Sequence, residues 1–314
     1  MDTQSPERHV DITVVTAARN EVGNVAPFLA EVRSALATLA LKGEVIFIDD
    51  GSSDGTSDAV RGAAAGAPDL PVRLIRYLRS HGLANALEVG FAHASGDLVC
   101  VLPADLESRP AADIPLLYAA MDAYADVVCG RRIRRGDGKA LASDIFAKVN
   151  RWLFNVQVHD SNWIKLIRRD RLQGIRLYTD WHRFLVALLV YRGCRVKEVE
   201  TVWRRREYGR SKFGFARMPA GLAGAIQVKA YLLWRDRSML CFAHVALVSL
   251  LVAVLAALTA LVVGSHHPAW VPAWGYSIAA QAVAVITIAI GLALDFTSWQ
   301  RETDRPQPVD DNRL

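Results

Sequence analysis

The longest uncharged stretch of this chain constrains its architecture more than any other feature. Residues 238–294 contain no Lys, Arg, Asp or Glu, a run of 57 residues. A helix needs about 20 apolar residues to cross a hydrocarbon core about 30 Å thick, so this run is long enough for two crossings. The polar turn at residues 265–268 divides the run, which predicts membrane-spanning helices at 239–264 and 270–294. The alternative, two core helices of a large soluble protein, needs a partner surface that the remaining sequence does not provide.

The charges that flank the uncharged run predict how it is oriented. Basic residues precede the first predicted crossing and follow the second, whereas the turn between them has no Lys or Arg; these residues are Lys229, Arg235, Arg237, Arg301 and Arg305. Positive charge marks the cytoplasmic side of a membrane, so both termini are expected there. Residues 1–9 are polar and lack the apolar core of a signal peptide, which agrees with a cytoplasmic front domain.

Charge and cysteine content narrow the range of partners. The net charge is +5, with arginines clustered at 131–135 and at 204–212. No nucleic-acid-binding motif accompanies these clusters, and the predicted anchor makes anionic lipid or phosphate the better partner than nucleic acid. The four cysteines show neither zinc-site nor disulfide-framework spacing, so they are interpreted as reduced, small apolar residues.

The front half of the chain alternates apolar runs with helical patterns. Strands are predicted at residues 10–17, 44–49, 72–77, 97–102 and 126–129, and helices at 22–41, 54–65, 82–94 and 110–124. Strands that alternate with helices and are apolar on both faces indicate an α/β fold with a mostly parallel sheet covered on both sides. In such sheets, ligands bind at the carboxyl ends of the strands.

The segments that follow the predicted strands carry the candidate site. Thr16, Ala17, Arg19 and Glu21 follow the first strand, and Asp49 and Asp50 open a glycine turn after the second. Asp105 and Glu107 follow the fourth strand, and Arg131 follows the fifth. Acidic residues at two strand ends and arginines at another are expected to converge on one edge of the sheet, where they suit a metal-bound phosphorylated ligand.

Five motifs in order resemble those of family 2 glycosyltransferases with the GT-A fold. IFIDDGSSDGT at 46–56 is similar to their nucleotide-binding turn, and GLANALEVG at 82–90 with ASGD at 94–97 to their central helix. Asp105 stands in the place of their metal motif. Asp160 ahead of WIKL, together with EVE at 198–200, and REYGRSKF at 206–213 resemble the dolichol-phosphate-mannose-synthase-like branch. Together, motifs in this order are a much stronger signal than any one of them alone.

The resemblance implies a function for the whole chain. It implies that a sugar is transferred, with inversion, from a nucleotide-sugar to a polyprenyl phosphate at the cytoplasmic face of the bacterial inner membrane. It also implies Mg²⁺ or Mn²⁺ as cofactor and a homo-oligomer, and it covers residues 11–213 and the two predicted crossings. Two rivals remain: a processive polysaccharide synthase, whose QxxRW motif is missing here, and a non-enzymatic descendant that serves as a scaffold.

The resemblance also assigns roles to individual residues. The residues predicted to bind the nucleotide-sugar are Thr16, Ala17, Arg19, Glu21, Asp49, Asp50 and Asp105. Arg131, Arg206, Ser211 and Lys212 are predicted to bind the lipid phosphate. The predicted catalytic residues are Asp105, Arg131, Arg206 and Lys212. Two simpler roles stay open: Asp50 or Asp54 could merely cap the next helix, and Arg204 and Arg205 could contact lipid headgroups. His182 is expected to face the pocket.

The metal motif departs from the family pattern at one position. Pro103 replaces the first aspartate, and Glu107 stands where a glutamine is usual. In an extended segment, residues 103, 105 and 107 would share one face. We therefore expect Asp105 and Glu107 together to hold the metal. The alternative is an exposed Glu107 near the start of a helix.

The predicted organisation has four parts. Residues 1–213 form a cytoplasmic GT-A domain, and 214–238 form amphipathic helices on the membrane surface, with a core helix as the alternative. Residues 239–294 form the two-helix membrane hairpin, and 295–314 form a polar, disordered cytoplasmic tail.

Overall fold

The computed structural model describes residues 9–133, 140–178, 180–205, 218–234, 238–263, 275, 278–283, 285–286 and 309–310. The chain divides into two units, one of residues 1–229 with 308–314 and the other of residues 230–307. The predicted roles of Arg206, Ser211 and Lys212 fall outside the described residues, as does most of the second predicted crossing.

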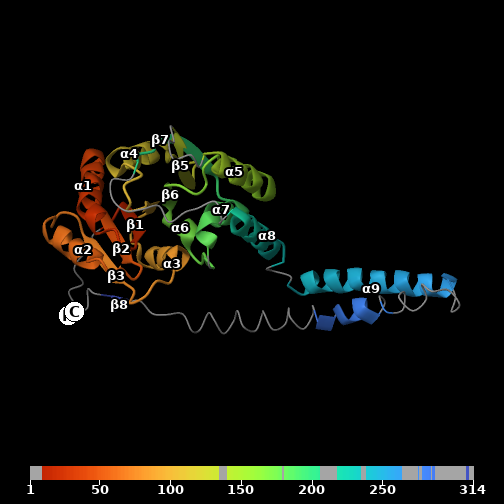
Figure 1. Ribbon diagram of the computed structural model, residues 1–314. Coiled ribbons are helices and arrows are strands. Elements are labelled where there is room, and N and C mark those ends of the chain that lie inside the picture. Colours follow the sequence, from red (N-terminus) through yellow and green to blue (C-terminus); the bar gives the residue numbers. More distant parts are fainter. Residues whose placement is uncertain are drawn as a thin grey trace, which may run out of the picture. The chain divides into compact units, whose positions relative to one another are not determined.

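The first unit is built around one mostly parallel sheet (Figure 1). In the described residues its strand order is β7-β5-β6-β4-β1-β2-β3-β8. The strands are β1 (Ile12–Ala18), β2 (Gly43–Asp49), β3 (Val72–Arg76), β4 (Leu98–Val101), β5 (Val127–Ile133), β6 (Lys165–Arg168), β7 (Val196–Val202) and β8 (Val309–Asp310). β6 runs antiparallel to β4 and β5, and β8 antiparallel to β3. The predicted α/β sheet is therefore confirmed.

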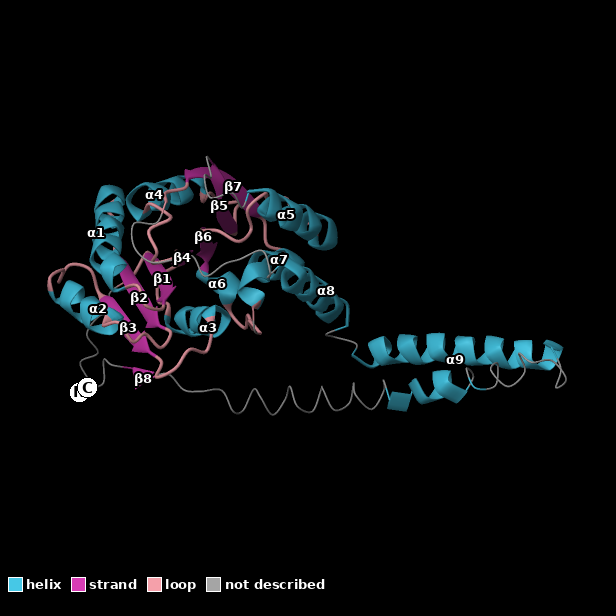
Figure 2. Ribbon diagram, in the orientation of Figure 1, coloured by secondary structure: helices cyan, strands magenta, loops and turns pink. Residues whose placement is uncertain are grey.

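Helices cover both faces of this sheet (Figure 2). The first unit contains α1 (Val22–Leu39), α2 (Thr56–Ala65), α3 (Leu83–His93), α4 (Pro110–Ala120), α5 (Ala140–Phe154), α6 (Arg169–Leu172), η1 (Trp181–Phe184), α7 (Leu185–Tyr191) and most of α8 (Met218–Trp234), whereas α9 (Ser238–Val263) belongs to the second unit. Apolar residues of α1, α2 and α4 form one core with one face of the sheet, whereas α3 packs on β1 and β2 and contacts η1. The first four predicted helices are confirmed, with shorter ends.

The strands are apolar because side chains on both faces of the sheet are buried, as their sequences predict. Val14, Val45, Phe47 and Cys100 are fully buried on the face that α1 and α4 cover, and Val15 is fully buried as well. Two-sided burial favours continuous Val and Ile runs over alternation of apolar and polar residues. Gly90 allows α3 to lie close to β1, because a Cβ there would lie 2.4 Å from the Val15 side chain.

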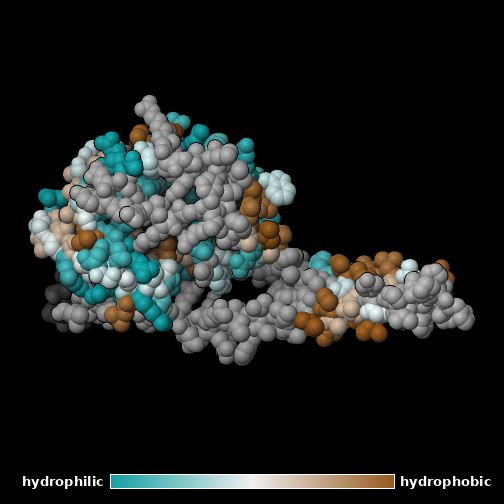
Figure 3. Space-filling model, viewed as in Figure 1, coloured by the Kyte–Doolittle hydropathy of each residue, from teal (hydrophilic) through white to brown (hydrophobic). Residues whose placement is uncertain are grey.

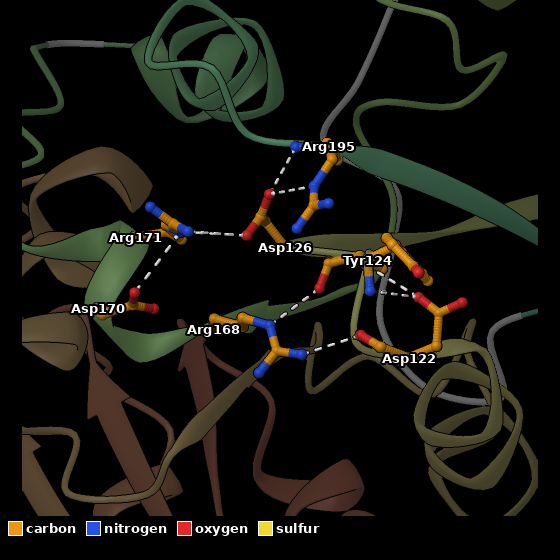
Figure 4. Close-up of polar contacts among 8 residues, drawn as sticks. Asp122, Tyr124, Asp126, Arg168, Asp170, Arg171 and Arg195 are labelled. Carbon is orange, nitrogen blue, oxygen red and sulfur yellow. Dashed lines mark hydrogen bonds and ion pairs between the residues drawn. The ribbon is translucent and has the colours of Figure 1, made fainter.

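At the amino edge of the sheet, Asp126 joins three elements (Figure 4). Its carboxylate accepts hydrogen bonds from the Arg171 side chain at 3.1 Å and from the main-chain N–H of Arg195 at 2.8 Å. Burial of the Asp126 carboxyl raises its pKa, but the Arg195 amide and the Arg171 and Arg195 charges outweigh burial and leave the pKa lowered. The start of β5 is thus tied to α6 and to the start of β7.

Helix α9 has almost the bounds predicted for the first membrane crossing. Its exposed residues are apolar over much of its length, including Leu250, Leu251, Leu255 and Leu258 (Figure 3). Of the residues that the structure describes, no helix reaches the length and apolarity needed to cross a membrane.

We expect Asp126→Asn to lower the free energy of unfolding by about 1–3 kcal/mol, because two arginines lose a buried anionic partner. The lowered pKa means that the stabilisation by Asp126 is present above about pH 4 and disappears as the pH falls below that. Urea unfolding of the full-length chain at pH 7 and pH 3 measures both effects. Asp58→Asn is the control, because Asp58 is exposed and pairs with Arg61 on its own helix; an equal loss in both variants would contradict the expectation.

Candidate functional site

The loops that follow β1 and β2 are fastened to each other. The main-chain N–H of Asn20 donates to Ser52 Oγ at 2.9 Å, and Asn20 Oδ1 accepts from the Ser53 N–H at 2.9 Å. The Glu21 N–H donates to Thr56 Oγ1 at 3.0 Å. These bonds place the predicted nucleotide-binding residues of the two loops side by side at the carboxyl edge of the sheet.

The residues predicted after β1 differ in exposure. Thr16 is fully buried, and its Oγ1 has no hydrogen-bond partner in the described part of the chain. Ala17 is half-buried and Arg19 is exposed. Glu21 is half-buried, and its carboxylate accepts from Asn24 Nδ2 at 2.5 Å. Arg19 is therefore the member of this loop whose side chain is most open to a ligand in solution.

Asp49 stabilises the turn that follows it. Its side chain is buried, with Oδ1 accepting from the Ser52 N–H at 2.8 Å and Oδ2 accepting from the Ser57 hydroxyl. The nearby Asp54 accepts from the Thr56 N–H at 3.0 Å at the start of α2. Burial raises the pKa of Asp54, but hydrogen bonds from Thr56 and Val22 outweigh it and lower the pKa. Helix capping thus belongs to Asp54, as one of the two open interpretations allowed.

Asp50 connects β2 to the start of α3 instead of capping α2. Its carboxylate accepts from Ser80 Oγ at 2.6 Å and from the main-chain N–H groups of His81 at 2.7 Å and Gly82 at 3.1 Å. Gly51 lets the two loops touch, because it has a φ of +74° and a Cβ there would lie 2.6 Å from the Arg79 carbonyl carbon. Three donors therefore hold the Asp50 carboxylate in one orientation at the edge of the site.

The segment around Asp105 is a turn, so the expectation of an extended segment there was wrong. Leu106 has a φ of +55°, and Asp105 Oδ1 accepts from the Glu107 N–H at 3.1 Å. A left-handed residue between them breaks the alternation on which a shared face for 103, 105 and 107 depended. Asp105 is buried and Glu107 half-buried. Sequence alone did not indicate the left-handed Leu106, since β-turn signals usually involve Gly or Asn at such positions.

Residues that follow β7 hold this turn in place. Trp203 Nε1 donates to Glu107 Oε2 at 3.3 Å, and the Arg204 N–H donates to the Glu107 carbonyl at 2.9 Å. The Arg204 side chain donates to the Leu106 carbonyl at 3.0 Å and to Glu31 at 3.3 Å. The Arg204 guanidinium therefore binds the Leu106 carbonyl and Glu31, and its contact with lipid headgroups stays a prediction.

The donor set around Asp105 fits a divalent cation that a substrate helps to bind. Among the described residues, no group of three or more His, Cys, Asp or Glu side chains is arranged to hold a metal ion. Mg²⁺ commonly uses one or two protein carboxylates and takes its other ligands from water and substrate phosphates. Asp105 and Glu107 supply at most two carboxylates, so they fit that kind of site and do not fit an all-protein cage.

Two consecutive arginines at the end of β5 have different surroundings. Arg131 is about half exposed and forms an ion pair with the exposed Glu200, with Nη1 and Oε1 3.7 Å apart. Arg132 is 13% exposed, and its Nε and Nη2 donate to the two oxygens of Asp160 at 2.7 and 3.0 Å. Its guanidinium carbon lies 4.6 Å from the centre of the Trp163 ring. Successive strand residues point to opposite faces, so only one of the pair lies on a given side of the sheet.

Sequence analysis singled out Arg131 and missed Arg132. Both follow the same apolar run, and the choice depended on where the strand was taken to end. The signal that could have found Arg132 is Asp160, which the sequence places in a motif and the structure places against Arg132. A bidentate carboxylate holds a guanidinium in one plane, which orients its remaining donors.

Two further basic side chains, the buried Lys165 and the half-buried His182, lie near this edge. The ammonium of Lys165 donates to the Trp163 carbonyl at 2.6 Å, and burial lowers its pKa. Burial, with a smaller effect of Arg183, lowers the pKa of His182 to about 4, so its imidazole is neutral at pH 7. His182 Nδ1 is enclosed without a partner in the described part of the chain.

Comparison with known proteins supplies a family. The family described as Glycosyl transferase family 2 matches residues 13–184, which include the sheet strands β1 to β6. The dodecaprenyl-phosphate galacturonate synthase of Rhizobium johnstonii is 27% identical over 247 residues, covering 75% of this chain and 71% of that protein. The undecaprenyl-phosphate 4-deoxy-4-formamido-L-arabinose transferase of Aeromonas hydrophila is 32% identical over 206 residues, covering 65% of this chain and 63% of that protein.

A solved structure shares the fold. Glucosyl-3-phosphoglycerate synthase from Mycobacterium tuberculosis, in complex with Mn²⁺, uridine diphosphate and phosphoglyceric acid, superposes with a TM-score of 0.52. It is 18% identical, and the match covers 70% of this chain and 78% of that one. At this level of identity the likeness establishes the arrangement of the sheet and its helices.

Proposed function

The chain belongs to glycosyl transferase family 2, and on that premise we propose that it moves a sugar, with inversion, from a nucleotide-sugar to a polyprenyl phosphate. The observation that carries the proposal is the carboxyl edge of the sheet, where Asp50, Asp105 and Arg132 each lie at or just after the end of a strand and are held by protein hydrogen bonds. Two relatives whose names describe prenyl-phosphate sugar transfer support the choice of acceptor.

The donor nucleotide belongs to the loops after β1 and β2. Thr16, Ala17, Arg19 and Glu21 come from the first loop, and Asp49 and Asp50 from the second. The Asp49 and Asp50 carboxylates already accept protein hydrogen bonds, and each oxygen has more than one lone pair to offer. In this proposal their carboxylate oxygens, held in place by the protein, accept hydrogen bonds from the base and ribose of the donor.

Asp105, together with Glu107, would hold Mg²⁺ or Mn²⁺ beside the donor diphosphate. When bound, the metal supplies positive charge that stabilises the leaving nucleoside diphosphate. The turn at Leu106 and the bonds from Trp203 and Arg204 keep both carboxylates at this edge. Asp105 is buried, so its orientation is set before any ligand arrives.

The acceptor phosphate is proposed to meet arginines at the end of β5. Arg132 is better placed for this than Arg131, because Asp160 and Trp163 fix the plane of its guanidinium. Arg206, Ser211 and Lys212 remain further candidates from the sequence motif. A phosphate monoester has a second pKa near 6, so its oxygen is largely ionised at pH 7 and needs positioning more than a strong base.

The lipid acceptor requires the domain to lie at a membrane. We propose that residues 239–264 and 270–294 form the anchor, with 214–238 at the interface and the turn at 265–268 on the outer side. The uncharged run and the exposed leucines of α9 support this. Pro103, in place of the first metal aspartate, keeps a non-enzymatic homologue as the second candidate.

Purified full-length protein, given polyprenyl phosphate and a panel of labelled nucleotide-sugars, should move label into the organic phase with one of them. Asp105→Asn should lower that transfer at least about 100-fold, because the metal loses its buried carboxylate. EDTA should stop the reaction, and added Mg²⁺ or Mn²⁺ should restore it. Donor binding without transfer in any combination would favour the non-enzymatic homologue.

Arg132→Ala should reduce transfer at low polyprenyl phosphate concentration by about 10–100-fold, because a hydrogen bond between charged groups is lost. Arg131→Ala should reduce it less, since that side chain is 43% exposed and its ion pair with the exposed Glu200 orients it only weakly. Initial rates at several acceptor concentrations separate the two variants. Arg131→Ala with the larger loss would reverse the assignment.

Membrane orientation can be read from thiol labelling in a variant without the native cysteines. A cysteine placed at Ser265 should react with an impermeant maleimide added outside intact cells, because the turn is expected on the outer side. A cysteine placed at Gln307 should react only after the cells are opened. Outside labelling at position 307 would contradict a cytoplasmic C-terminus.

A further inference from the structure

Glu198 on β7 holds the turn that precedes β6. Its Oε1 accepts from the main-chain N–H groups of His159 at 2.7 Å and Asp160 at 2.8 Å, and its Oε2 lies 2.8 Å from His159 Nδ1. The Glu198 side chain is 14% exposed. A carboxylate that satisfies two adjacent amides fixes the main chain at that point, because each amide would otherwise need another acceptor.

The main chain that Glu198 fixes carries the partner of Arg132. Asp160 accepts three hydrogen bonds from Arg132, two from its guanidinium and one from its main-chain N–H at 3.3 Å. Asp160 and Arg132 are 16% and 13% exposed. A free arginine side chain loses rotamer entropy when it binds a ligand. Here the Asp160 contact and the Trp163 ring remove that freedom beforehand.

We propose that Glu198 is a positioning residue for Arg132, acting through the main-chain amides of His159 and Asp160. The inference rests on the proposed function, in which Arg132 binds the acceptor phosphate. In this proposal Glu198 itself does not contact the phosphate, because two negatively charged groups in contact would repel each other. Its carboxylate binds the main-chain amide of Asp160, and the side chain of Asp160 binds the Arg132 guanidinium.

Glu200 supplies a matched control on the same strand. It lies two residues further along β7, so its side chain leaves the strand on the same face as that of Glu198. Its side chain is 63% exposed and forms an ion pair with Arg131 at 3.7 Å. A general effect of removing a negative charge from β7 would appear equally in Glu198→Ala and Glu200→Ala, whereas positioning of Arg132 would appear only in the first.

The kinetic test uses the full chain in lipid nanodiscs. Glu198→Ala should raise the KM for polyprenyl phosphate about tenfold, the equivalent of losing one to two hydrogen bonds, and leave the donor KM within about twofold. Glu200→Ala should change neither. Glu198→Gln should recover most of the acceptor affinity, because its amide oxygen can still accept from both N–H groups. Equal acceptor KM values in Glu198→Ala and wild type would overturn the proposal.

A double-mutant cycle asks whether the effect passes through Arg132. In the Arg132→Ala background, Glu198→Ala should raise the acceptor KM by less than about twofold, because the group that it positions is gone. A further tenfold rise there would overturn the proposal. If Glu198→Ala does not fold, Glu198→Asp replaces it with the same expectations, since it keeps the charge and shortens the reach.

Hydrogen–deuterium exchange separates this inference from the proposed function. Amides in a peptide that contains His159 and Asp160 should exchange at least about fivefold faster in Glu198→Ala than in wild type. In Glu200→Ala their exchange rate should be unchanged. This readout needs no substrate. Unchanged exchange would overturn the positioning role even if transfer occurs, whereas a wild-type protein that transfers no sugar would overturn the proposed function whatever the exchange shows.

Discussion

Carboxylates that accept hydrogen bonds from main-chain N–H groups shape the carboxyl edge of this sheet. Asp50 fixes the loop before α3, Asp105 fixes its own turn, and Glu198 fixes the turn before β6. Asp50 and Glu198 bind groups 30 or more residues away, whereas Asp105 binds an amide two residues further along the chain. These acids therefore stabilise the loops at this edge, and for Asp50 and Asp105 we propose that they serve the ligand as well.

This double use explains why sequence patterns locate the edge but not the part that each acid plays. Runs such as that of β2 are apolar on both faces, and their burial in a parallel sheet follows from composition alone. A capping role and a ligand role both call for an aspartate at a strand end. Only the partners distinguish them, and for Asp50 the partners lie 30 or more residues away.

Other features escaped prediction for local reasons. β6 is four residues long and runs antiparallel, unlike the parallel strands before it. β7 mixes Val with Lys, Glu and Thr, so its sequence does not resemble the continuous apolar runs of the buried parallel strands. The turn at Leu106 requires a left-handed leucine, which no residue type signals. The choice between Arg131 and Arg132 depended on the face that each residue takes, and a shift of one residue in the strand reverses that face.

The position of β6 between β4 and β5 also has a consequence for how the chain is made. β1 to β4 come from residues 12–101 and pair with one another, so they can assemble while the remainder is still being synthesised. β5 cannot join them directly, because β6 separates it from β4 and is made some 30 residues later. Strands of high sequence separation pair slowly, and an unpaired edge invites wrong partners. The arginine end of the site is thus completed last, shortly before residues 239–294 emerge from the ribosome.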